Sequence, residues 1–244
     1  MRTGDRRDER WEEAQKQDAP NGRRDGRPEQ LPVLSVIVPA YNAEHCLTRC
    51  LSSLILPEKY QKDAEILVIN DGSTDHTAML AEAWKKRYPE QIRVIHKENG
   101  GHGSAINTGI DAARGTYVRV VDGDDWVDTG DYRSFVRKLK RLNCDAVVTR
   151  FAVVTCRDGR ERKTVRKPVL PRVPYGRICL FRDICRRSYL KMHELTLRTE
   201  LLRARRIRVR EHSFYVDMEY ILYPAPYIRH LCVLPECVYQ YRMG

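Results

Sequence analysis

The sequence lacks the features that mark several protein classes. None of its eight cysteines belongs to a CxxC pair, which argues against a zinc site. Residues 1–30 are charged throughout and contain no apolar stretch of the kind found in a secretory signal. We therefore expect reduced thiols in a cytoplasmic protein.

Long apolar runs are also missing. No run approaches the roughly 20 residues of a membrane helix, and the best candidate, residues 33–40, contains Pro39. With 14 Gly, 12 Pro and no persistent heptad, the collagen-like, low-complexity and coiled-coil classes are excluded. The 244 residues suffice for one large domain or two small ones. Residues 1–30 carry too little apolar surface to fold, so we expect a disordered tail and a fold that begins near Leu31.

The basic residues are unevenly distributed. The chain has 44 Lys and Arg against 33 Asp and Glu, a formal net charge of +11. Residues 1–30 hold 8 of each sign and residues 31–150 hold 16 of each, whereas residues 151–244 hold 20 basic and 9 acidic side chains. This distribution argues against a protein that tracks a phosphate backbone with its whole surface, and it leaves open a basic final module.

Short apolar runs alternate with amphipathic stretches between residues 31 and 150. Five runs have the length and β-branched character of strands buried on both faces: 34–38, 65–70, 92–96, 116–121 and 145–149. Between the first two, Leu47, Leu51 and Leu54 recur at helical spacing. Such repeats predict a doubly wound α/β layer, in which ligands bind beyond the carboxyl ends of the strands.

Polar segments that contain glycine or asparagine follow four of these strands. They are residues 39–42, 70–75, 98–103 and 122–126. Each segment taken alone is explained as a turn or a helix cap. Because the carboxyl ends of parallel strands meet at one edge of a sheet, the coincidence of all four predicts a binding site at that edge.

Three carboxylates, Asp122, Asp124 and Asp125, directly follow the fourth apolar run. They repel one another unless a cation lies among them. Carboxylate oxygens suit Mg²⁺ or Mn²⁺, which proteins commonly hold together with substrate phosphates. On an extended turn Asp122 and Asp124 point to the same side, so we expect these two to bind the metal and Asp125 to cap the next segment. The cluster predicts a metal that bridges a diphosphate.

The glycine turn at residues 101–103 permits a second interpretation. Gly101-His102-Gly103 is similar to the start of a dinucleotide fingerprint, but Ile106 stands where the third glycine is needed, and the motif follows the third strand instead of the first. No Walker sequence is present. A dinucleotide oxidoreductase is therefore disfavoured, and we expect the turn's backbone amides to approach the phosphates or the sugar of a nucleotide donor.

Three segments carry a family resemblance. LSVIVPAYNAEHCLTRCLSSL, EILVINDGSTD and NGGHGSAINTGIDAARGTYVRVVDGDDW, in this order and spacing, resemble family-2 glycosyltransferases of the nucleotide-sugar GT-A fold. The resemblance covers residues 33–150 and is fainter beyond. It implies a Rossmann-like, mostly parallel sheet with helices on both faces, a donor-binding half at residues 31–150 and a smaller acceptor-side subdomain at residues 151–244. Relatives commonly continue past the position of Gly244, so we expect a truncated C-terminus.

The resemblance also implies roles at the strand ends. The family's metal-binding Asp-x-Asp motif falls on Asp122-Gly123-Asp124, with Asp124 as the direct ligand of Mn²⁺ or Mg²⁺ and Asp122 nearer the ribose and a metal-bound water. Tyr41 would lie against the base of a nucleotide such as UDP, and Asp71 would hydrogen-bond that base. The other residues expected in the donor site are Pro39, Gly101, Asn107 and Gly123.

One departure from the family pattern concerns a missing cation. The common Ala-Arg-Asn stands here as Ala105-Ile106-Asn107. Either His102 or a basic residue of the last segment takes the place of that arginine, or donor binding differs from the family norm.

The resemblance implies that residues 151–244 cover the acceptor and supply the catalytic base. An inverting transfer needs a carboxylate that accepts the proton of the attacking hydroxyl. The family's acidic residue in an aromatic setting falls on Asp217, whereas Val216 replaces the usual Glu and Glu219 faces away on a helix. His193 is a further candidate ligand near the metal or diphosphate, with a structural loop histidine as the alternative.

Two functional hypotheses follow. The leading one is a metal-dependent inverting glycosyltransferase that moves a sugar from a nucleotide donor to an acceptor hydroxyl, with a UDP-sugar as the expected donor. A nucleotidyltransferase, which releases pyrophosphate, is its related alternative. The second is a catalytically weak module whose basic half binds anionic lipid or nucleic acid, although no aromatic-basic interleaving typical of RNA-binding sheets is present. The basic half favours an anionic polysaccharide or lipid-linked acceptor, peripheral membrane association at the inner face, and no specific nucleic acid. We expect Tyr239 and Tyr241 in the core.

Overall fold

The computed structural model describes residues 31–157, 160–166, 173–185 and 189–243. The tail expected to be disordered, residues 1–30, lies outside the described residues. Residues from Leu31 onward belong to one structural unit.

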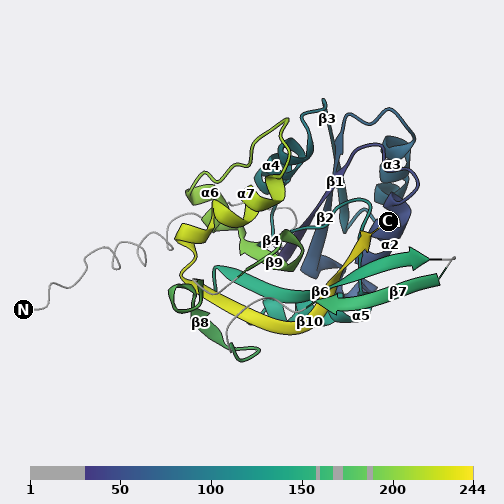
Figure 1. Cartoon of the computed structure of the whole chain (residues 1–244). Coiled ribbons are helices and arrows are strands. Elements are labelled where there is room, and N and C mark those ends of the chain that lie inside the picture. Colours follow the sequence, from purple (N-terminus) through teal and green to yellow (C-terminus); the bar gives the residue numbers. More distant parts are fainter. Residues whose placement is uncertain (1–30, 158–159, 167–172, 186–188, 244) are drawn as a thin grey trace, which may run out of the picture. The chain divides into compact units, whose positions relative to one another are not determined.

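Ten strands form one sheet within the described residues (Figure 1). The order along the sheet is β3-β2-β1-β4-β9-β6-β10-β5, with β7 paired to β6 and β8 paired to β10. The strands are β1 (Leu34–Ala40), β2 (Ala64–Asp71), β3 (Ile92–Lys97), β4 (Tyr117–Val120), β5 (Trp126–Val127), β6 (Ala146–Arg157), β7 (Arg160–Arg166), β8 (Ile178–Leu180), β9 (Leu195–Arg198) and β10 (His230–Met243).

The parallel part of the sheet contains β3, β2, β1 and β4. Every residue of β1, β2 and β4 is buried, which explains why these strands read as continuous apolar runs in the sequence. The order places β2 and β4 on opposite sides of β1, so the winding of the chain reverses beside β1. A ligand crevice is expected at such a switch point, beyond the carboxyl ends of β1 and β4.

The second half of the chain extends the same sheet. The antiparallel strand β9 lies between β4 and β6, and β10 pairs with β6 in parallel orientation. The boundary expected at residue 150 falls inside β6, so both halves contribute to one sheet. No sequence pattern indicated β9, because it has only four residues and lacks the alternation seen before residue 150.

Helices cover both faces of the sheet, as predicted. The α-helices of the described residues are α2 (Leu47–Leu54), α3 (Thr77–Arg87), α4 (His102–Ala112), α5 (Thr129–Leu139), α6 (Thr199–Ala204) and α7 (Val216–Leu222), and the short 3₁₀ helices are η1 (Glu58–Asp63), η2 (Phe181–Asp183), η4 (Met192–Glu194) and η5 (Ala225–Tyr227). Among these residues, no helix has both the length and the apolar character needed to cross a bilayer.

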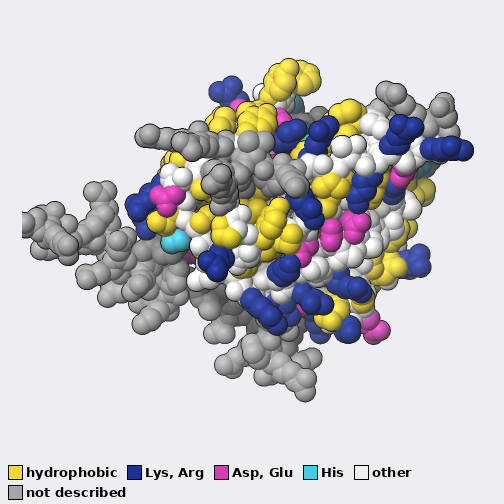
Figure 2. All heavy atoms as spheres, turned by 60° about the horizontal axis from the view of Figure 1, so that its bottom comes forward, with side chains coloured by type: hydrophobic (Ala, Val, Ile, Leu, Met, Phe, Trp, Pro, Cys, Tyr) yellow, Lys and Arg dark blue, Asp and Glu magenta, His cyan; other side chains and the backbone are white. Residues whose placement is uncertain are grey.

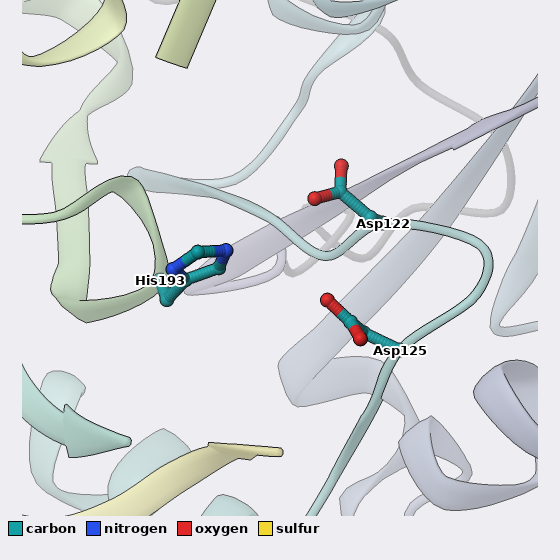
Figure 3. A group of neighbouring side chains, drawn as sticks. All are labelled: Asp122, Asp125 and His193. Carbon is teal, nitrogen blue, oxygen red and sulfur yellow. The ribbon is translucent and has the colours of Figure 1, made fainter. Parts of the chain in front are cut away.

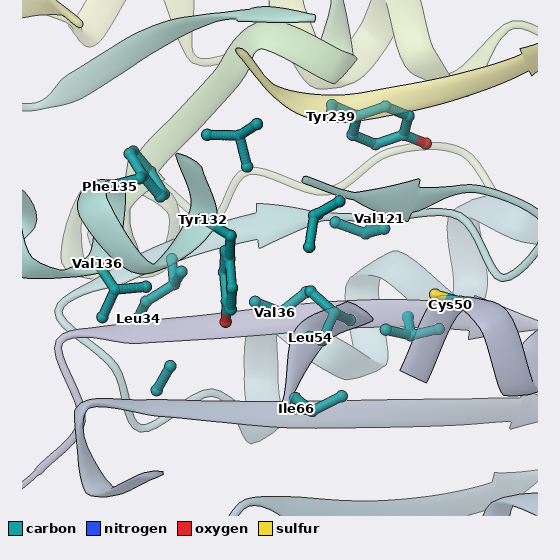
Figure 4. Close-up of a cluster of buried hydrophobic side chains, with 14 of the residues drawn as sticks. Leu34, Val36, Cys50, Leu54, Ile66, Val121, Tyr132, Phe135, Val136 and Tyr239 are labelled. Carbon is teal, nitrogen blue, oxygen red and sulfur yellow. The ribbon is translucent and has the colours of Figure 1, made fainter. Parts of the chain in front are cut away.

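Two apolar cores follow from the alternation of side chains along β1. Val36 and Val38 pack on the face covered by α2, α3 and α5, a cluster drawn in Figure 4. Ile37 packs on the opposite face, with side chains of α4, α6 and α7. The mixed α/β fold with a central sheet between two helix layers is therefore confirmed, and it holds the strand ends rigidly at one edge.

Candidate active site

The loop after β4 forms a tight turn against the end of β1. The backbone N–H of Asp125 donates to the carbonyl of Asp122 at 3.0 Å, and the N–H of Gly123 donates to the carbonyl of Pro39 at 3.2 Å. A Cβ at position 123 would lie 2.9 Å from that carbonyl oxygen, so only glycine fits without a shift. Pro39 and Gly123, both expected in the donor site, thus set the position of the acidic loop.

Asp122, Asp125 and His193 converge on one point. Each offers one ligand atom, and these atoms all lie within 4.8 Å of one another. Figure 3 shows the two aspartates on the loop after β4, opposite the imidazole of His193 from η4. Two carboxylates and an imidazole form a donor set that suits Mn²⁺ and related divalent ions. Of the expected ligands, the structure brings Asp122 and His193 together, whereas the side chain of Asp124 is exposed and lies outside the group.

The prediction that Asp125 caps the next segment is wrong. Asp128 caps α5 by accepting from the N–H of Asp131, while Asp125 is buried and accepts from the Tyr239 hydroxyl at 2.6 Å and from the N–H of Arg242 at 2.6 Å. The turn of the loop folds Asp125 back toward Asp122. Burial raises the pKa of Asp125 to about 7, against the hydrogen bonds from Arg242 and Tyr239.

Tyr239 links β10 to the acidic loop. Its ring is fully buried, as predicted for a core residue, but its hydroxyl also accepts from the N–H of Asp122 at 3.2 Å and lies 3.2 Å from the Asp122 carboxylate. Because a phenol has a single hydrogen, this hydroxyl donates to Asp125 or to Asp122 at any one time. The hydroxyl therefore fixes the spacing of the two carboxylates.

His102, the first residue of α4, contacts the acidic loop. Its Nε2 lies 2.8 Å from Oδ1 of Asp122. Burial lowers the pKa of His102, but the hydrogen bond and the charge of Asp122 outweigh this effect and leave the pKa raised. One helical turn further on, Ile106 is completely buried in the core. Of the two substitutes suggested for the missing arginine, the structure thus brings His102 into contact with the acidic loop.

His193 is held by aromatic rings and by a buried arginine. Its ring centroid lies 4.7 Å from that of Tyr239 and 4.8 Å from that of Tyr241, and burial lowers its pKa, which favours the neutral imidazole that metals bind. The backbone carbonyl of His193 accepts from the guanidinium of Arg119, which also donates to Thr196 at 3.0 Å. Arg119 is completely buried, and burial lowers its pKa to about 10.

Asp217 lies exposed in the first turn of α7 and lines an open pocket of about 750 Å³ together with His193. Its charge favours the protonated forms of both His102 and His193, although burial dominates at His193 and leaves the pKa of that residue lowered. Glu219, by contrast, accepts from the N–H of Arg210 at 2.7 Å. The expected separation of the two α7 carboxylates is thus present, with Asp217 facing the pocket and Glu219 fastening the preceding segment.

Asp71 is engaged by the turn between β3 and α4. Its buried carboxylate accepts from the N–H groups of Gly100 and Gly101 at 3.0 and 2.8 Å and from Nζ of Lys97 at 2.7 Å. Gly101 has a φ of +82°, a conformation that favours glycine. The expected contact of Asp71 with a nucleotide base would thus use an oxygen that already holds this turn. Tyr41, just beyond β1, has 54% of its surface exposed and is open to a ligand.

Asn107 fastens the segment before α7 to α4. Its Oδ1 accepts from the N–H of Val209 at 3.1 Å, and its Nδ2 donates to the Val209 carbonyl at 2.9 Å and to Glu211 at 3.2 Å. The whole amide is therefore used within the protein, although the resemblance placed Asn107 among the donor-binding residues. Val209 is buried, so these bonds are shielded from water.

Comparison with known proteins decides the family. A sequence model described as glycosyl transferase family 2 matches residues 35–196, well over half of the chain. The chain belongs to glycosyltransferase family 2.

Several bacterial proteins are similar to this family-2 chain. It is 39% identical over 140 residues to the uncharacterized glycosyltransferase EpsJ of Bacillus subtilis, covering 57% of the chain and 39% of EpsJ. It is 35% identical over 96 residues to the poly(ribitol-phosphate) beta-glucosyltransferase of Bacillus spizizenii, covering 38% of the chain and 15% of that protein. The chain thus spans well under half the length of these relatives.

A solved structure shares the fold. The crystal structure of S. aureus TarS 1–349 in complex with UDP-GlcNAc superposes with a TM-score of 0.69 and 22% sequence identity, covering 86% of this chain and 58% of that one. The match confirms the GT-A architecture of this family-2 chain.

Three residues of this family-2 site were not recognised from the sequence: Asp125 as a member of the cluster, Tyr239 as its hydrogen-bond partner and Arg119 as the support of His193. Arg119 carried a usable signal, because a charge in the middle of an apolar strand needs a buried partner. Asp125 and Tyr239 carried none, because their roles depend on a turn and on the register of β10.

Proposed function

We propose that this chain transfers a sugar from a nucleotide diphosphate donor, of the UDP type, to an acceptor hydroxyl with inversion and with the help of Mn²⁺ or Mg²⁺. The observation that carries the proposal is the placement of Asp217 and His193 on one open pocket, with Asp122 beside His193. A candidate base and a candidate metal site thereby border the same space.

The metal would be held by Asp122 and His193, with Asp125 or the exposed Asp124 completing the protein ligands. When bound, a divalent ion neutralises the charge that develops on the departing diphosphate. His102, which lies 2.8 Å from Asp122, would add a positive charge on the same side when it is protonated. Tyr41, which is exposed beyond β1, is proposed to stack on the nucleotide base. Gly101 and Asp71 shape the turn between β3 and α4, whose backbone would lie close to the phosphates of the donor.

Asp217 is proposed as the general base. The acceptor oxygen forms a bond to the anomeric carbon of the donor sugar while the bond between that carbon and the diphosphate oxygen breaks. The hydroxyl proton passes to Asp217, and the nucleoside diphosphate leaves. A single displacement of this kind inverts the anomeric configuration. The position of Asp217 at the pocket, free of a hydrogen bond to Glu219 or Arg210, suits this role.

We propose that the acceptor is an anionic polymer or a lipid-linked sugar of the cell envelope. The transfer would take place at the inner face of the membrane. Lys191 and Arg166 line the pocket beside Asp217, and β7 carries four basic residues and one acidic residue, all exposed. Figure 2 shows many more Lys and Arg than Asp and Glu side chains on the face turned forward from the lower side of Figure 1. A Bacillus spizizenii relative named for poly(ribitol-phosphate) supports this acceptor class, and TarS, solved with UDP-GlcNAc, supports the UDP-type donor.

A donor screen tests the proposal. The protein is incubated with a panel of UDP-sugars and Mn²⁺, with and without candidate acceptors, and released UDP and pyrophosphate are measured separately. Asp217→Asn should lower the turnover at least about a hundredfold while leaving UDP affinity within a few-fold. Glu200→Gln, an exposed carboxylate in the first turn of α6, is the matched control and should keep wild-type turnover. If wild type never exceeds Asp124→Ala for any donor, or if pyrophosphate is the product, the proposal fails.

A further inference from the structure

Four large apolar side chains are exposed at and just before α7. Phe214 is 90% exposed, Tyr215 82%, Met218 38% and Leu222 57%, and we call these four residues the α7 apolar surface. On the helix itself Met218 and Leu222 are one turn apart and face away from the buried residues Val216 and Tyr220. The opposite side of α7 therefore anchors the helix in the core, while the α7 apolar surface is presented to the solvent.

The backbone holds this surface in place. The N–H of His212 donates to the carbonyl of Gly100 at 2.8 Å, and the N–H of Arg210 donates to Glu219 at 2.7 Å. His212 and Tyr215 adopt φ angles of 49° and 62°, which side-chain-bearing residues rarely do. Ordered backbone therefore directs Phe214 and Tyr215 outward. Single exposed apolar residues need no explanation, whereas four within nine positions of one ordered segment are typical of an interaction site.

An arginine-rich segment precedes the α7 apolar surface in the chain. Residues 203–210, directly before it, contain five arginines in eight positions. Ile207 and Val209 are buried in the core, so the residues between them and beside them, Arg206, Arg208 and Arg210, are exposed. Arg208 pairs with Asp111 and Arg210 with Glu219, while the guanidinium of Arg205 lies over the ring of Tyr227 at 5.0 Å. Exposed apolar side chains bordered by arginines complement the headgroups and the outer acyl region of an anionic bilayer.

We propose that the α7 apolar surface docks the protein on an anionic lipid bilayer. Phe214 and Leu222 enter the headgroup boundary, and the neighbouring arginines contact lipid phosphates. Docking itself does not require the proposed glycosyl transfer. Its consequence rests on that function: because Met218 also lines the pocket of Asp217, docking brings this pocket to the membrane surface, where a lipid-linked acceptor hydroxyl is presented.

Vesicle sedimentation tests the docking. Vesicles of phosphatidylcholine with about a third phosphatidylglycerol are compared with vesicles of pure phosphatidylcholine, at low and at high salt. Wild type should bind the anionic vesicles at least about tenfold more strongly than the neutral ones, and salt should weaken the binding. The double variant Phe214→Asp with Leu222→Asp should lose at least about tenfold in binding. The control is Met79→Asp on α3, which removes an apolar side chain of 62% exposure and should bind as wild type does.

Insertion is measured directly with Phe214→Trp. Its fluorescence should shift to shorter wavelength on anionic vesicles and be quenched by lipids brominated on their acyl chains. The proposal is overturned if wild type does not bind anionic vesicles, if the double variant binds as tightly as Met79→Asp, or if light scattering shows a dimer of wild type that the double variant loses. UDP affinity, measured by calorimetry on the same variants, should be unchanged. If wild type fails to bind anionic vesicles but binds UDP and releases UDP from a donor in solution, the docking is refuted and the proposed function stands.

Discussion

Replacement of Asn107 by alanine separates a structural role from a role in donor binding. The wild-type amide satisfies both backbone polar groups of the buried Val209, at 3.1 and 2.9 Å. Each buried backbone group that loses its partner costs about 1–3 kcal/mol, so the loss of both partners in Asn107→Ala should lower the free energy of unfolding by about 2–6 kcal/mol. Because the segment that includes Val209 leads to α7, which carries the proposed base Asp217, the variant should also turn over the donor more slowly, measured as the rate of UDP formation.

Urea denaturation followed by far-ultraviolet circular dichroism measures this loss. Asn143→Ala is the matched control, because Asn143 is exposed and bonds only to the Arg198 side chain among the described contacts, and it should change stability by at most about 0.5 kcal/mol. UDP affinity of folded Asn107→Ala should stay within a few-fold of wild type. The reasoning is refuted if Asn107→Ala unfolds like Asn143→Ala but loses its UDP affinity, because Asn107 would then contact the donor directly.

Three further perturbations have defined outcomes. Tyr239→Phe removes a 2.6 Å hydrogen bond to Asp125. The affinity for Mn²⁺, measured by electron paramagnetic resonance, should fall about tenfold, and the free energy of unfolding should fall by about 1–2 kcal/mol. Unchanged Mn²⁺ affinity would contradict the role of Tyr239 in spacing the two carboxylates. Gly103→Ala drives a Cβ into the carbonyl of Arg210 and should cost about 1–3 kcal/mol in urea denaturation, whereas Gly130→Ala, whose nearest neighbour would lie at 3.5 Å, should cost nothing. Chelation with EDTA should abolish UDP release and added Mn²⁺ should restore it; full activity in EDTA would exclude the metal dependence.

The parallel half of the fold could be predicted because its physical signals are local. Strands buried on both faces are apolar at most positions, and β1, β2 and β4 are buried along their whole length, so their apolar runs were visible in the sequence. The location of the site at the carboxyl ends of the parallel strands could also be predicted, because the polar segments directly follow these apolar runs. His193 and Asp217 were found through the family resemblance alone, because a histidine in a loop and an aspartate in a first turn have no distinctive local pattern.

The remainder depended on contacts between distant segments. Tyr239 and Asp125 are 114 residues apart in the chain, and the hydroxyl contacts the carboxylate only because β10 runs beside β5 and β6. A tyrosine in an apolar strand is normally explained by its ring, and the sequence does not tell where its hydroxyl points. Asp125 was misassigned for a related reason, since alternation along an extended segment places it away from Asp122, and the loop turns instead.

Strand β6 crosses the predicted boundary at residue 150, and this continuity limits how the chain can be re-engineered. A fragment ending at residue 150 would stop within β6 and leave β4 without its neighbour β9, exposing an unpaired edge that invites aggregation. Acceptor preference therefore cannot be exchanged by grafting everything after residue 150 from a relative. Exchange has to be confined to loops and edge strands, such as β7, that join the sheet on one side only.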